Sequence, residues 1–222
     1  ILGWLGIMVI EPYGNAITPT RVYFFDRPGA GNTPKVIESV QERLRLGDIG
    51  KILVASESGR LALELKTSVA GATIVCVTYN EETRREYRKP ALMKDQLLKA
   101  GVLVVDTVSE PLGRDLTFRN WWEKETIILR DASADLFWMT LLCVGGHGLR
   151  TAVEITFMAV EAGVVSVGER VVSVAGTRWG ADSAIVMRGS RFEDAVGQDP
   201  EKRMKIEEVL AMPKHTEWTG YG

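Results

Sequence analysis

The chain has 222 residues, of which 45% are hydrophobic and 25% charged, a composition typical of a globular protein and not of a disordered one. Its formal net charge of −2 and its pI ≈ 5.9 exclude a general attraction to nucleic acid or anionic lipid, so an anion-binding site must be local. We therefore expect one domain over residues 20–222 after an N-terminal tail or arm at residues 1–19, with neither nucleic acid nor a membrane as its partner.

The N-terminal segment and the two cysteines bear on the cellular compartment. Residues 1–10 are apolar but too short for a membrane-spanning helix, and they lack the basic start and the small-residue cleavage site of an export signal. Cys76 and Cys143 lie in or beside apolar runs without the spacing of a metal site, which predicts two buried, unpaired thiols. We expect a reducing, cytoplasmic location.

From residue 21 onward, short apolar runs rich in β-branched residues alternate with segments of helical period. This alternation is typical of an α/β fold, a three-layer sandwich with a mostly parallel central sheet. The predicted strands are 22–25, 52–55, 73–79, 102–105, 171–175 and 183–187, with an edge strand at 209–212. Helices are predicted to begin at Thr33, at Ser58-Gly59 and at Pro90, and a helix buried between layers is predicted over 149–162 with Gly163 ending it.

The alternation lapses over residues 109–135, a polar stretch that contains Trp121 and Trp122. So long an excursion in a compact domain is typical of a lid, a binding loop or an oligomer contact. An ordinary surface excursion, with its tryptophans packed on the domain, is equally open.

A first chemical candidate is the turn Ser56-Glu57-Ser58-Gly59-Arg60 between a predicted strand and helix. Two hydroxyls, a glycine that allows close approach and the N–H groups of the first helical turn together suit a phosphate or carboxylate. Arg60 can add a positive charge. The alternative interpretation is a plain serine N-cap.

A second candidate is the turn at 176–182, with the sequence Gly-Thr-Arg-Trp-Gly-Ala-Asp, between two predicted strands. Ligands of open α/β sheets gather beyond the carboxyl ends of the strands, where this turn is expected beside the serine turn. A long hairpin turn without a ligand is the alternative.

Three weaker candidates lie elsewhere on the chain. Asn32 follows the first strand within a glycine-bracketed turn and can bind a flat heterocycle or cap the next helix. Thr78 and Tyr79 end the third strand, where an aromatic ring can lie against a ligand or close the core. His147 lies between Gly146 and Gly148, but without a nearby nucleophile or paired carboxylate in sequence no acid/base pair can be named.

The segment 51–80, with its serine turn and its Val77-Thr78-Tyr79-Asn80 strand end, resembles the C-terminal α/β domain of pyruvate kinase. In pyruvate kinase the equivalent turn holds a phosphate of the allosteric sugar bisphosphate, and Ser56, Ser58, Gly59 and Arg60 are the matching positions. The turn at 176–182 is similar to the second effector loop of that domain.

Over residues 23–213 the chain is more similar still to the stand-alone archaeal proteins of the pyruvate kinase α/β-domain-like family, which resemble flavin mononucleotide (FMN) binders. Trp179, where a smaller or basic residue is expected, and the tail before Pro19 depart from the pattern. The motifs that carry the resemblance are Phe-Asp-Arg-Pro-Gly at Phe25, Asn32-Thr33, the serine turn, Gly146-His147-Gly148-Leu149, Val153-Glu154-Ile155-Thr156 and Gly180-Ala181-Asp182.

The resemblance implies a protein that binds a phosphate-bearing small molecule, FMN, at the carboxyl ends of the parallel strands, without a nameable catalytic residue or a metal. A flavin-dependent oxidoreductase and a sugar-phosphate-binding regulatory or partner-binding module are the alternatives, and self-association into a homo-oligomer is left open. Pyruvate kinase activity is not expected because the catalytic barrel is absent. The expected ligand-binding residues are Phe25, Asn32, Thr33, Ser56, Glu57, Ser58, Gly59, Arg60, Thr78, Tyr79, His147, Gly176, Thr177, Arg178, Gly180, Ala181 and Asp182.

Overall fold

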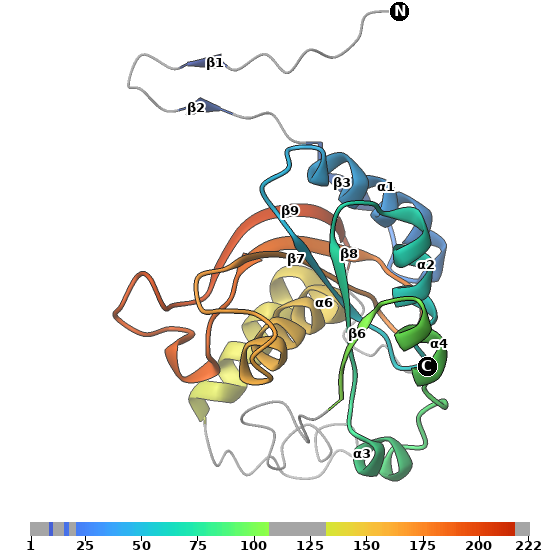
Figure 1. Ribbon diagram of the computed structural model, residues 1–222. Coiled ribbons are helices and arrows are strands. Elements are labelled where there is room, and N and C mark those ends of the chain that lie inside the picture. The colour runs from blue at the N-terminus through green and yellow to red at the C-terminus, as the bar shows by residue number, and fades with distance from the viewer. Residues whose placement is uncertain (1–8, 11–15, 18–20, 107–131, 216–222) are drawn as a thin grey trace, which may run out of the picture.

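The computed structural model describes residues 9–10, 16–17, 21–106 and 132–215. Seven strands form one mixed sheet in the order β3-β9-β8-β7-β4-β5-β6, and β1 pairs with β2 in a separate sheet (Figure 1). The strands span Val9–Ile10 (β1), Ala16–Ile17 (β2), Tyr23–Phe25 (β3), Lys51–Ala55 (β4), Thr73–Val77 (β5), Leu103–Val105 (β6), Arg170–Ala175 (β7), Ser183–Arg188 (β8) and Lys205–Pro213 (β9).

The direction of the strands confirms a mostly parallel sheet. β4 is parallel to β5 and β7, β5 is parallel to β6, and β3 is parallel to β9. β8 is antiparallel to both of its neighbours, β7 and β9. The carboxyl ends of β4, β5, β6 and β7 therefore meet at one edge of the sheet, which we call the carboxyl edge, and their amino ends lie at the amino edge.

Helices cover both faces of the sheet, an arrangement compatible with a three-layer sandwich (Figure 1). α1, α2 and α4 pack on one face, and α6 packs on the other. The helices span Thr33–Leu44 (α1), Arg60–Ser68 (α2), Glu81–Glu86 (α3), Lys94–Lys99 (α4) and Ala132–Glu161 (α6), with short 3-10 turns at Ala30–Asn32 and Phe192–Asp194.

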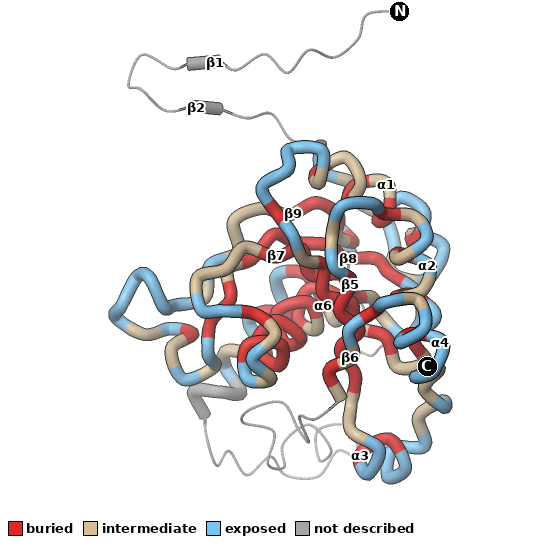
Figure 2. The backbone as a smooth tube through the Cα atoms, in the orientation of Figure 1, coloured by how far each residue is buried: buried red, intermediate tan, exposed pale blue. Residues whose placement is uncertain are grey.

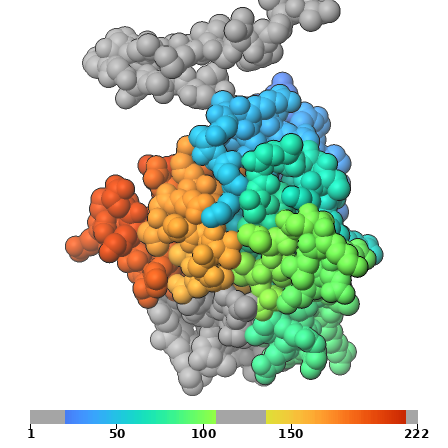
Figure 3. All heavy atoms as spheres, in the orientation of Figure 1, coloured from blue at the N-terminus to red at the C-terminus, as the bar shows by residue number. Residues whose placement is uncertain are grey.

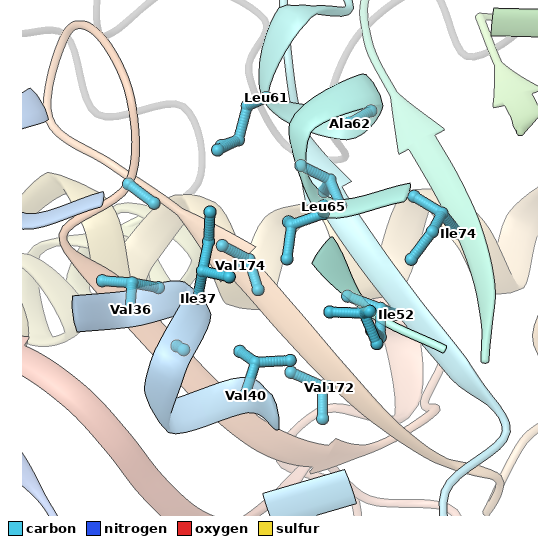
Figure 4. Close-up of a cluster of buried hydrophobic side chains, with 14 of the residues drawn as sticks. Val36, Ile37, Val40, Ile52, Leu61, Ala62, Leu65, Ile74, Val172 and Val174 are labelled. Atoms are coloured by element: carbon cyan, nitrogen blue, oxygen red, sulfur yellow. The ribbon is translucent and has the colours of Figure 1, made fainter. Parts of the chain in front are cut away.

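The buried strands supply side chains to both layers because neighbouring residues of a strand point to opposite faces. Ile52 and Val54 of β4 pack against α1 and α2, whereas Leu53 between them packs against α6. Figure 4 shows Ile52 and Val172 of the sheet facing Val40 of α1. Figure 2 shows that the central strands and much of α6 are buried. This double burial explains why the strands read as continuous apolar runs.

Two predictions about local structure are wrong. The predicted edge strand at 209–212 belongs to β9, which lies inside the sheet because β3 pairs along its other edge, Tyr23 against Ala211. The helix predicted to begin at Pro90 begins at Lys94 instead. An unpredicted helix, α3, precedes it, because the Asn80 side chain caps that helix by accepting from the Thr83 amide at 2.8 Å.

The buried helix predicted over 149–162 is the second part of α6, which begins at Ala132. Gly146 interrupts this helix with φ 71° and ψ −166°, and Gly163 follows its end with φ 70° as predicted. The prediction that Cys143 is buried is wrong, whereas Cys76 is buried, and both thiols are free. Cys143 is exposed because Trp138 and Leu141 occupy the side of α6 that packs on the sheet.

Several predictions fall on residues that the structure does not describe. The N-terminal arm at 1–19 lies outside the described residues except for β1 and β2, and so does the excursion at 109–135 up to residue 131. Within the described part of the chain, none of the helices combines the length and the apolar character that crossing a membrane requires.

Candidate functional site

A cavity of ≈ 1200 Å³ opens at the carboxyl edge of the sheet. Ala55 ends β4 and residues 56–58 follow it, residues 78–79 follow β5 and residues 176–180 follow β7, and all three segments line the cavity. Residues 89–91 and Met93 close one side, and α6 contributes from His147 to Met158. Figure 3 shows that the blue-to-green and the orange-to-red halves of the chain meet on one face of the molecule. The cavity thus gathers segments that are distant in sequence.

The serine turn is a tightly built start for α2. Gly59 adopts φ 89°, and a Cβ at this position would lie 2.9 Å from Leu97 Cδ1, so a larger residue is both strained and crowded. Ser56 Oγ accepts a hydrogen bond from the Gly59 amide at 3.1 Å, and Ser58 Oγ accepts one from the Arg60 amide at 3.4 Å. The two hydroxyls therefore stabilise the turn before α2, whose N-cap is Gly59 without a side-chain cap, and each still carries its own O–H donor at the cavity.

Arg84, which is buried, holds this turn in place. Its Nη1 donates to the carbonyl oxygen of Glu57 at 2.6 Å and to Thr78 Oγ1 at 3.0 Å, while Nη2 donates to the Pro90 carbonyl. One guanidinium thus joins three walls of the cavity. Sequence reasoning missed Arg84, and the signal that could have found it was the Asn80 cap, which places Arg84 on α3 beside the end of β5.

The turn at 176–182 connects antiparallel strands, so it is a hairpin turn, and it also lines the cavity. The Asp182 side chain, fully buried, organises it: Oδ2 accepts from the amides of Thr177 and Gly29, both at 2.9 Å, and Oδ1 accepts from Ser183 Oγ at 3.0 Å. Arg178 has φ 70°, a strained conformation for a residue with a side chain. Such strain is frequent in loops that hold ligands.

A second contact fixes the same turn from α1. Thr33 Oγ1 accepts from the Ala181 amide at 2.9 Å, and a Cβ on Gly180 would lie 2.5 Å from that oxygen. Asn32 Nδ2 donates to the Arg27 carbonyl at 2.8 Å. Thr33 therefore supports the hairpin turn, whereas Asn32 stabilises its own turn after β3.

The wall from α6 carries polar groups at helical spacing. His147 is half-buried, and this burial is the main reason why its pKa is lowered. The positive charge of Arg150 lowers the pKa further, and the negative charge of Asp182 acts in the opposite direction. Arg150 and Glu154 form a buried ion pair, with Nη1 3.4 Å from Oε2, and Thr151 lies between them in sequence. At neutral pH His147 is thus a neutral imidazole with one donor and one acceptor.

The structure brings most of the predicted ligand residues together. Six of the predicted residues are described but do not line the cavity, and of these Thr33, Gly59 and Asp182 support its walls as set out above. The six are Phe25, Asn32, Thr33, Gly59, Ala181 and Asp182. The predicted residues that line it are Ser56, Glu57, Ser58, Arg60, Thr78, Tyr79, His147, Gly176, Thr177, Arg178 and Gly180.

Further lining residues were not predicted. Trp179, which departs from the pattern of the family that the sequence resembles, lines the cavity and is 63% exposed. Lys89 pairs with Glu57 at 2.6 Å, and Arg150 and Glu154 follow His147 by one and two helical turns. The helical period after His147 was the available signal for the last two, since it places 150, 151 and 154 on the face that carries 147.

Comparison with models of known protein families finds no model that matches the chain. The fold and the site together define an α/β protein with a mostly parallel sheet and a polar cavity at the carboxyl edge. In residues 21–106 and 132–215 no three His, Cys, Asp or Glu side chains are grouped to hold a metal ion.

Proposed function

We propose that the cavity binds a phosphate-bearing small molecule, FMN, with the phosphate at the serine turn and the flavin ring against the other walls. The observation that carries this proposal is the serine turn itself, which faces the cavity at the start of α2 with two hydroxyls and an adjacent guanidinium, Arg60. Hydroxyl and first-turn N–H donors beside a positive helix end are the groups that phosphate prefers.

The rigidity of the turn supports the proposal. Ser56 and Ser58 are oriented by the amides that they accept from, and Arg84 clamps the Glu57 carbonyl between them. Binding to donors that are already ordered costs less conformational entropy than binding to donors that must be ordered by the ligand.

The charges of the cavity also favour an anion. Four cationic side chains line it, against three carboxylates, although the whole chain carries a net charge of −2. Two of the carboxylates are paired, Glu57 with Lys89 and Glu154 with Arg150. The lining is therefore net positive within a net acidic chain. The cations are Arg60, Lys89, Arg150 and Arg178, and the carboxylates are Glu57, Glu64 and Glu154.

A flat aromatic ligand fits the remaining surface. Trp179 presents a largely exposed indole, and Tyr79 lies at the end of β5. Offset stacking on such a ring favours a planar heterocycle beyond the area that it buries. The apolar side chains Leu61, Met93 and Met158 complete a surface suited to the flavin ring.

The same proposal includes the fold family: we assign the fold to the pyruvate kinase C-terminal domain-like type.

Two measurements test the proposal. The visible spectrum of the purified protein, with mass analysis of what it releases on denaturation, identifies a retained flavin. Titration with FMN and with riboflavin, followed by quenching of flavin fluorescence, then measures the contribution of the phosphate. We expect tighter binding of FMN, and equal affinities for the two flavins would contradict a phosphate site.

The variant Ser58→Asp places a carboxylate at the phosphate site, and Ser166→Asp, on an exposed residue before β7 at the amino edge, is its matched control. Loss of one charge-assisted hydrogen bond costs about 1.5–3 kcal/mol, or about ten- to a hundredfold in affinity. We expect Ser58→Asp to lose at least this much for FMN and little for riboflavin, while the control binds as wild type.

A further inference from the structure

The ion pair of Arg150 and Glu154 is the most deeply buried one at the cavity. The two side chains are 5% and 4% exposed, and both line the cavity from the same face of α6. Taking two charges out of water costs several kcal/mol per ion, so a buried ion pair often stabilises a fold no better than apolar side chains of the same volume. Stability alone therefore does not account for this pair.

An aromatic cluster fixes the guanidinium. Arg150 lies over the ring of Trp138 with its Cζ 5.0 Å from the centroid. Trp138 in turn stacks on Phe192, with centroids 5.6 Å apart and planes at 7°, and Phe157 meets it edge-on at 6.2 Å. A guanidinium held over such a cluster is restricted in its orientation, which suits recognition of a planar group more than general attraction of an anion.

The layers of the fold separate Arg150 from the phosphate site. The serine turn begins α2, which packs on one face of the sheet, whereas Arg150 belongs to α6 on the other face. A ligand whose phosphate lies at α2 therefore reaches Arg150 with its far end, across the carboxyl edge of the sheet. His147, one turn earlier on α6, adds a neutral imidazole to the same wall.

We propose that Arg150 is a specificity-determining residue that binds the carbonyl-bearing edge of the ligand's planar ring, across the carboxyl edge of the sheet from the serine turn. This inference rests on the proposed function. In a flavin, one edge of the ring carries two carbonyl oxygens, each beside a ring nitrogen that accepts hydrogen bonds, with one N–H donor between the carbonyls, and the opposite edge carries only methyl groups. The planar fork of Arg150 matches the acceptor-rich edge, because its parallel N–H groups can meet two acceptors at once.

Two variants of the full chain separate this role from a structural one. The paired change Arg150→Met with Glu154→Leu removes both charges at similar volume, which avoids leaving a lone charge in the protein. Arg150→Lys keeps the charge beside Glu154 but loses the planar fork, so it tests the proposal if the paired variant fails to fold. Arg188→Met, at the amino edge of the sheet, is the matched control. Thermal unfolding verifies that each variant is folded.

The measurement is the affinity for FMN and for riboflavin, which shares the ring but lacks the phosphate. We expect the paired variant to bind both flavins at least tenfold more weakly, with an unchanged ratio of the two affinities. Arg150→Lys should also lower the affinity for both flavins, and the control should bind as wild type.

Wild-type binding of both flavins by folded Arg150 variants would overturn the role of Arg150 and leave the phosphate site intact. A loss confined to FMN would also overturn it, since Arg150 would then contact the phosphate. If the wild type binds no flavin, the proposed function fails and this inference fails with it.

Discussion

The two edges of the central sheet use the same kinds of charged residue in different ways. At the amino edge, charged side chains pair with one another: Arg43 binds Asp48 and Glu208, each at 2.7 Å, and Arg170 binds Glu207 at 2.5 Å. At the carboxyl edge, charged side chains line a cavity, and the pairs there, Lys89 with Glu57 and Arg150 with Glu154, face it as well. Charges that satisfy one another stabilise the fold, whereas charges directed at a cavity are available to a ligand. We therefore expect substitutions at the first edge to change stability, and at the second to change binding.

The largest effect is expected for Arg43→Met. The Arg43 side chain is 2% exposed, and it donates hydrogen bonds through Nε, Nη1 and Nη2. Removing one partner of a buried ion pair costs about 3 kcal/mol or more. We expect a decrease of about 3 kcal/mol in the free energy of unfolding, measured with urea, and unchanged FMN affinity.

The control for this prediction is Arg188→Met, because Arg188 is 39% exposed and binds Glu207 at 2.6 Å on the same edge. Exposed ion pairs contribute about 0–1 kcal/mol. Equal destabilisation by the two variants would show that burial does not distinguish these arginines.

The pH dependence of stability sharpens the same contrast. Hydrogen bonds from Arg43 lower the pKa of Asp48 from 3.8 to about 2. Because the folded-state pKa is the lower one, the stabilisation is present above pH 3.8 and is lost as the pH falls toward 2. We expect the melting temperature of the wild type to approach that of Asp48→Asn over this interval. A constant difference between the two proteins, measured by circular dichroism, would contradict the assignment.

Gly59→Ala is expected to affect both stability and binding. The substitution meets a positive φ and the Leu97 side chain, whereas Gly47→Ala meets a positive φ with nothing within 4 Å. Backbone strain of this kind costs about 1–2 kcal/mol. We expect Gly59→Ala to be the more destabilising of the two in urea and to weaken FMN binding, since it displaces the serine turn. Retention of wild-type FMN affinity by folded Gly59→Ala would separate the turn from the binding site.

The sequence predicts those features of the fold that leave a local pattern of residues. The alternation of apolar runs and helical segments predicted the sheet, because double burial leaves a strong local pattern in strands such as residues 52–54. The serine turn and the hairpin turn were predicted at one cavity because both follow strands that run in the same direction.

Other features depend on contacts between distant residues and leave no local pattern. β9 is internal only because β3 pairs with its far edge, and the roles of Thr33 and Asp182 as supports of the hairpin turn depend on contacts across the fold. The amino-edge ion pairs were likewise not predicted, since Arg43 and Glu208 are 165 residues apart. Local pattern therefore predicted the strands and most of the helices, though not α3 or the first part of α6, and it did not predict the pairing between distant residues.

The smallest effect on stability is expected for Trp179→Ala, which makes it a sensitive test of the carboxyl edge. The Trp179 side chain is 63% exposed at the tip of the hairpin turn, so its removal takes little apolar surface out of the core. Substitutions at such exposed positions usually change the free energy of unfolding by less than about 0.5 kcal/mol.

If the indole stacks on the flavin ring, however, its loss removes about 0.5–1.5 kcal/mol of binding free energy, or roughly a factor of two to ten in affinity. Because stacking involves the ring and not the phosphate, FMN and riboflavin should lose affinity equally. Trp179→Phe, which keeps an aromatic face, should bind both flavins more tightly than Trp179→Ala. Unchanged binding of both flavins by Trp179→Ala would place the ring away from this turn, and the hairpin turn would then serve only as support.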